Sequence, residues 1–285
     1  MRMAIPNYRV ANPTTGARER HPRRVQPGVN KVYTMVFAIL LGLANLSMLA
    51  AADGSGSECE ARARREYWRA SAAHSKDPKD VKASWEFARA CFDVGECATN
   101  SAERAEVAEQ GIAVCRELLA RDPNLARAHY YLGMNLGQLA RTRGLSALKL
   151  VGQMENEFKR ARELDEKMDH AGPDRNLGLL YRDAPHVASI GSRSKAQRFL
   201  QRAVDVVPDF PENRLNLIES CLRWNDRNGA KRELKALEEL WASATTTLSG
   251  ADWECSWADW KKRLSQVKKK VEEPSKTIES PRGRD

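Results

Sequence analysis

The feature that most constrains this chain is a pattern of small and large residues that recurs along its middle. Small residues let two helices approach closely, and large apolar residues fill the groove between them. The pattern therefore predicts successive helical hairpins, each with a first helix (helix A) and a second helix (helix B). Its three most regular copies are carried by Leu132, Gly133, Phe158 and Ala161; by Leu177, Gly178, Tyr181, Ala196, Ala203 and Pro208; and by Leu217 and Ala230.

A fourth copy precedes these and is less regular. It is carried by Trp85, Ala88 and Phe92, then by Gly111, Cys115 and Leu118. The spacing of the last copy matches the tetratricopeptide repeat (TPR), a helix–turn–helix unit of about 34 residues. The other copies carry extra residues between helix A and helix B, and insertions on one edge of such an array often build a binding surface.

The chain after the last repeat predicts a single closing helix. Trp253, Trp257 and Trp260 begin an apolar stripe at helical spacing, as expected for a helix that covers the exposed end of a repeat array. We therefore predict an all-α fold, a TPR-type helical-hairpin solenoid with extended A–B turns and a C-terminal capping helix. The predicted parts are a repeat domain over 53–248 (about four repeats within 80–240), a capping helix over 249–271 and a disordered tail over 272–285.

The N-terminal part predicts export. Residues 1–34 are basic and show no periodicity, so we expect a disordered extension. Residues 35–52 carry no charge and end in three alanines, which is typical of a cleaved secretory signal peptide. An uncleaved membrane anchor is the alternative. We expect a periplasmic or otherwise exported protein, or one anchored by residues 35–52.

The net charge of +9 does not predict nucleic-acid binding, because it is concentrated at the two ends. Residues 1–52 hold seven basic residues and one acidic residue, and residues 261–285 hold nine basic and four acidic residues. The body between them is close to neutral, whereas a nucleic-acid groove needs basic residues on the folded surface.

Motifs for catalysis are missing from the sequence. It contains no H-E-x-x-H, G-x-S-x-G, P-loop or G-x-G-x-x-G pattern. We therefore expect no enzyme activity, no cofactor and no metal; a hydrolase without a motif would need Cys or His side chains in a shared pocket. The six cysteines lack a C-x-x-C pair, and the sequence leaves their pairing open.

Candidate binding residues lie on the predicted A helices, which should line the concave face. The ninth candidate, His186, lies on the third insertion. The full set is Tyr130, Met134, Gln138, Arg175, Leu179, Arg182, His186, Glu219 and Arg223. They form a mixed polar and apolar lining, and we expect it to contact a protein partner.

The middle of the chain resembles exported bacterial TPR proteins like the T component of tripartite ATP-independent periplasmic (TRAP) transporters. The resemblance is carried by AHYYLGMNLGQLART and by the A-P…S-I-G loop before PDFPENRL. It implies a non-enzymatic periplasmic adaptor for a solute-binding subunit, with a channel for a hydrophobic small molecule. The chain lacks the lipidated cysteine common in that family.

Two alternatives stay open from the sequence. One is a general envelope or assembly adaptor that acts as a homo-oligomer. The other is a mitochondrial TPR protein, since the chain also resembles, more distantly, the regulators of microtubule dynamics.

Overall fold

The computed structural model describes residues 54–185 and 189–273, all within one compact unit. The predicted extension over 1–34 and the signal peptide or anchor over 35–52 lie outside the described residues, as does most of the predicted tail. In the described part, all regular structure is helical. The helices are α2 (Gly54–Lys76), α3 (Val81–Cys97), α4 (Ser101–Arg121), α5 (Ala126–Ala140), η1 (Gly144–Ser146), α6 (Ala147–Leu164), α7 (Met168–Asp183), α8 (Arg193–Val206), α9 (Pro211–Arg223), α10 (Arg227–Thr247), η2 (Ala251–Trp253) and α11 (Glu254–Glu272).

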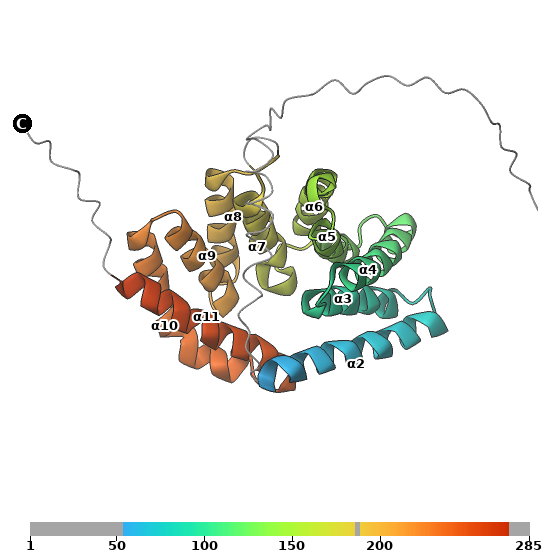
Figure 1. Ribbon diagram of the computed structural model, residues 1–285, viewed down its shortest axis with the longest axis horizontal. Coiled ribbons are helices and arrows are strands. Elements are labelled where there is room, and N and C mark those ends of the chain that lie inside the picture. The colour runs from blue at the N-terminus through green and yellow to red at the C-terminus, as the bar shows by residue number, and fades with distance from the viewer. Residues whose placement is uncertain (1–53, 186–188, 274–285) are drawn as a thin grey trace, which may run out of the picture. The chain divides into compact units, whose positions relative to one another are not determined.

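Four helical hairpins follow one another in the chain: α3 with α4, α5 with α6, α7 with α8, and α9 with α10. Figure 1 shows them in chain order between α2, in blue, and α11, in red. The A helices α5, α7 and α9 each also pack on the hairpin before them. The predicted all-α hairpin solenoid is therefore confirmed. The second and third copies place inserted residues in longer turns, while the first copy uses its extra residues to lengthen its helices.

Helix starts follow from side chains that cap the free N–H groups of the first turn. Asp80 accepts hydrogen bonds from the backbone of Lys82 and Ala83 at the start of α3. Ser192 accepts one from Lys195 at the start of α8, and a proline begins α9, where its missing N–H costs nothing. These capping residues therefore fix where each helix begins and where the preceding turn ends.

Close helix packing depends on the small residues of the pattern. A Cβ atom on Gly133 would lie 2.6 Å from the ring of Phe158, and one on Gly178 would lie 2.6 Å from Leu200. Ala161 is fully buried in the same way. The buried apolar residues form two clusters, one from α2 to the start of α8 and one from Leu200 to the end of α11.

The two end helices complete the array. α11 packs on α9 and α10, with Trp260 and Val267 buried, as predicted for a capping helix. α2 was not predicted; it packs on α3 and also contacts α11. A disulfide joins Cys59 of α2 to Cys255 of α11 across a Cα–Cα distance of 5.7 Å. The first and last described helices are thus covalently linked.

Candidate functional site

An aromatic pair from two successive A helices forms the centre of the candidate site. Trp85 of α3 and Tyr131 of α5 stack with ring centroids 6.0 Å apart and an interplanar angle of 6°. The guanidinium of Arg127, one turn before Tyr131, lies 4.5 Å from the Trp85 ring centroid. Trp85 is half-buried and Arg127 is exposed, so the group presents aromatic and cationic surface to solvent.

One turn further along α3, Arg89 and Asp93 form an ion pair at 3.7 Å. Arg89 also interacts electrostatically with Tyr131, with Asp169 of α7 and with Asp252 of η2. Arg89 is therefore within electrostatic range of side chains from three other elements, α5, α7 and η2. We call Trp85, Arg89, Asp93, Arg127 and Tyr131 the inner face.

The electrostatics of this surface are unusual at Asp93. Burial raises the pKa of its carboxyl to about 6, with Arg89 opposing the change and nearby acids, Asp169 first, reinforcing it. Its side chain is nevertheless 40% exposed, so water screens part of this effect. Asp93 thus combines a raised proton affinity with access to a ligand.

A left-handed turn opens α7 beside the inner face. Asp169, His170 and Ala171 have φ values of 48°, 55° and 62°, a region that costs non-glycine residues about 1–2 kcal/mol each. The buried guanidinium of Arg175 holds the turn by donating to the carbonyls of Asp169 and His170, each at 3.2 Å. The same guanidinium donates to the Asp169 carboxylate at 2.8 Å. The hydroxyl of Tyr130 is a second donor to that carboxylate.

The turn also directs His170 onto an aromatic cluster. Its ring stacks on Phe210 at a centroid distance of 4.1 Å and meets the edge of Trp253 at 5.5 Å. Burial lowers the pKa of His170, which favours the neutral form of the ring. It serves as a packing group between the third and fourth hairpins.

The structure places the predicted binding residues in three settings. Tyr130 and Arg175 are buried and meet at Asp169, and Gln138 is buried and bonded to Glu96. Met134 and Leu179 pack, partly buried, against the first and second apolar clusters. His186 lies outside the described residues.

The remaining three belong to ion-pair networks. Arg182 and Arg223 both pair with Asp183. Glu219 pairs with Arg263 of the capping helix at 2.8 Å. The structure therefore does not unite the nine residues in one surface, and their role in binding stays a prediction.

Sequence analysis missed the inner face as a unit. In the first copy it assigned Phe92 to the packed positions, whereas Phe87 is the buried phenylalanine and Phe92 is only half-buried. The signal that was present is the spacing of Trp85, Arg89 and Asp93, which lie four residues apart on one helix face.

The described residues also offer little for chemistry. Burial raises the pKa of Cys91 to about 12 and that of Cys221 to about 11, so both thiols stay protonated and are weak nucleophiles. Within residues 54–185 and 189–273, no group of three His, Cys, Asp or Glu side chains could hold a metal ion. None of the helices described there is long and apolar enough to cross a membrane.

Comparisons with known proteins support the fold. The family model "Regulator of microtubule dynamics protein 1-3" matches residues 50–171, which run from before α2 into the left-handed turn of α7. No curated protein matches the sequence closely enough to count as a relative.

Two solved structures are similar. One is TTC0263, a thermophilic TPR protein of Thermus thermophilus, with a TM-score of 0.55 and 19% identity over 82% of this chain and 97% of that one. The other is MamA, with a TM-score of 0.45 and 16% identity over 63% of this chain and 89% of that one. The first of these, together with the four hairpins and the capping helix, shows that the chain has the fold of a TPR solenoid.

Proposed function

We propose that this chain is a non-enzymatic scaffold that binds a partner protein along its inner face. The observation that carries the proposal is the half-buried Trp85 ring, which stacks on the buried Tyr131 and carries the exposed Arg127 beside it. Trp, Tyr and Arg are enriched among the few residues that dominate the binding energy of protein interfaces, and stacked helical repeats form extended binding surfaces. TPR folds in general mediate contacts between proteins, and such folds are not catalytic as a rule.

Site-specific photocrosslinking tests this assignment. A photoreactive amino acid is placed at Arg89, on the inner face, or at Arg116, an exposed position on α4 that serves as the matched outer control. The full chain is expressed in the organism from which it comes, and the cells are irradiated to form the crosslinks. We expect a discrete crosslinked partner from position 89 that is absent from position 116 and weakened by Trp85→Ala. Equal crosslinking from both positions would overturn the inner face as the binding surface.

The identity of the partner is a separate proposal. The family match favours a role like that of the regulators of microtubule dynamics, and polymerised tubulin is therefore the first target. We expect the chain to co-sediment with microtubules and Trp85→Ala to reduce the pelleted fraction. A chain that stays in the supernatant at all tubulin concentrations would exclude a direct microtubule role.

Export into an oxidising compartment is supported by the Cys59–Cys255 disulfide, since stable disulfides are rare in the cytosol. In that setting the second candidate function is that of a periplasmic adaptor of the TRAP T-component kind, with a solute-binding subunit as partner and a hydrophobic small molecule as ligand. N-terminal sequencing of the mature protein tests export, because cleavage after residue 52 would leave Asp53 at the N-terminus.

The alternative of a homo-oligomeric adaptor has its own test. Light scattering measures the molar mass of the chain in solution, and a strict monomer would exclude this alternative.

A further inference from the structure

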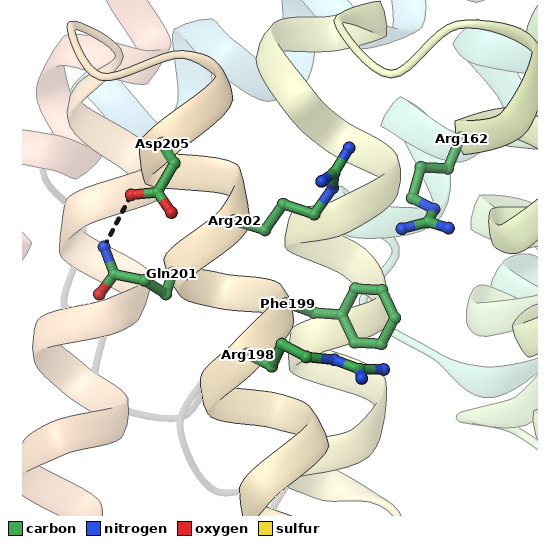
Figure 2. A pocket seen from close by; sticks show the side chains of 6 residues that line it. All are labelled: Arg162, Arg198, Phe199, Gln201, Arg202 and Asp205. Carbon is green, nitrogen blue, oxygen red and sulfur yellow. Dashed lines mark hydrogen bonds between the residues drawn. The ribbon is translucent and has the colours of Figure 1, made fainter.

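A polar hollow lies away from the inner face, on the B helices α6 and α8. It has a volume of about 550 Å³ and is open to solvent. Figure 2 shows its lining: three guanidinium groups are grouped around the ring of Phe199, and two polar side chains continue along α8. The lining residues are Arg162 of α6 and Arg198, Phe199, Gln201, Arg202 and Asp205 of α8.

Two of the guanidinium groups are held by the aromatic floor. Arg162 lies 5.6 Å and Arg198 lies 5.0 Å from the Phe199 ring centroid. A guanidinium that packs against a ring keeps its N–H edges free for a second contact and loses less side-chain freedom when a ligand binds. The hollow therefore presents fixed donors before any ligand arrives.

Carboxylates in and around the hollow pair with two of its three arginines, Arg162 and Arg202. The carboxylate of Asp174, fully buried on α7, lies 3.0 Å from Arg202 and 3.8 Å from Arg162. Arg202 also pairs with Glu166. One oxygen of Asp174 and the Nε of Arg162 are buried and have no hydrogen-bond partner.

Two cations in the first half of α8 lack a close ion pair with any described carboxylate. In the part of the chain that the structure describes, neither Arg198 nor Lys195, three residues earlier, forms an ion pair with a carboxylate. The ammonium of Lys195 lies 5.0 Å from the Tyr181 ring centroid. Two adjacent cations are thus placed on aromatic rings and directed to solvent.

We propose that this hollow, the α6–α8 pocket, binds an acidic segment of a partner protein through its Asp or Glu carboxylates. Arginine recognises carboxylates through paired N–H groups, and the buried Phe199 ring beneath Arg162 and Arg198 keeps these groups in position. The chain's own ends do not supply the ligand, because residues 1–52 and 274–285 both carry net positive charge. The pocket lies on the B helices, so it is independent of the inner face proposed above.

Fluorescence anisotropy with a labelled hexaglutamate peptide tests the proposal. The full chain is titrated at low salt, with hexaglutamine and hexalysine peptides as controls for charge. We expect saturable binding of hexaglutamate alone, weakened about fivefold or more by Arg198→Glu, as for the loss of a charge-assisted contact. The matched control is Arg116→Glu, which reverses one exposed charge on α4 and should change the affinity less than twofold.

Three results would overturn the proposal. The first is no binding of hexaglutamate. The second is equal weakening by both variants, which would show an effect of net charge alone. The third is displacement of the peptide by inorganic phosphate at the same total charge, which would show a site for any small oxyanion. Lys195→Gln is a second variant for the case that Arg198→Glu lowers stability. Lys195 is exposed, so its replacement should leave the fold intact and still weaken hexaglutamate binding.

Discussion

Arg175 is the residue on which the left-handed turn of α7 depends. It is 7% exposed, donates to two carbonyls of the turn and pairs with Asp169. We expect Arg175→Met to lower the free energy of unfolding by about 1–3 kcal/mol, because the carbonyl of Asp169 and the amide oxygen of Asn213 lose this donor. Urea denaturation measures this. Arg127→Met, on an exposed arginine, is the control and should cost less than about 1 kcal/mol.

Asp93 makes stability depend on pH. Its carboxyl binds a proton more tightly in the folded chain, with a pKa of about 6 against an ordinary value of 3.8. A raised carboxyl pKa means that stability is highest below pH 4 and falls as the pH rises towards 6. The difference corresponds to at most about 3 kcal/mol, and solvent at the exposed part of the side chain reduces it to about 1 kcal/mol.

Asp93→Asn should therefore stabilise the chain at neutral pH and have no effect in acid. We expect a gain of about 1 kcal/mol at pH 7.5 that disappears near pH 3.5, measured by chemical denaturation at both values. Asp209→Asn changes an exposed carboxylate in the turn before α9 and serves as the control, with no difference between the two pH values. A gain that is the same at both pH values would contradict the raised pKa of Asp93.

At the scale of the helix pair, glycine sets how closely helix A and helix B approach. Gly133→Ala should lower the free energy of unfolding by about 1–3 kcal/mol, since the new Cβ would lie 2.6 Å from the buried Phe158 ring. Gly152→Ala is the matched control inside α6, where no atom lies within 4 Å of the added Cβ. It should raise stability by about 0.5–1 kcal/mol through helix propensity. Thermal unfolding of the two variants separates packing from propensity.

The hairpins could be predicted from the sequence because close approach requires small residues at fixed positions, such as Gly133 and Gly178. α2 was not predicted although its Ala, Arg and Glu residues favour a helix, because much of its surface stays exposed and its sequence carries no repeat pattern. The inner face escaped detection because solvent-accessible helix-A residues need not follow the packing pattern. Six cysteines allow fifteen full pairings, so sequence alone does not select Cys59 with Cys255.

At the scale of the whole array, its two end helices are held together mainly by the disulfide. The link spans 196 residues of sequence, so it removes much of the freedom of the unfolded chain. Loop-closure entropy sets its contribution at up to about 5 kcal/mol. The ion pair of Arg62 with Asp252 also joins the ends, but Asp252 is 90% exposed and such pairs contribute little.

Reduction should therefore loosen α2 before it affects the middle of the array. We expect a reductant to lower the Tm of the parent chain and to speed amide hydrogen exchange in α2, while exchange in α5 and α6 stays slow. Cys59→Ser should show the lower Tm without reductant and no further change with it. Cys97→Ser, which removes a free thiol, should behave like the parent chain. If α2 exchanges equally slowly in the oxidised and reduced chains, its packing on α3 holds it in place and the disulfide does not.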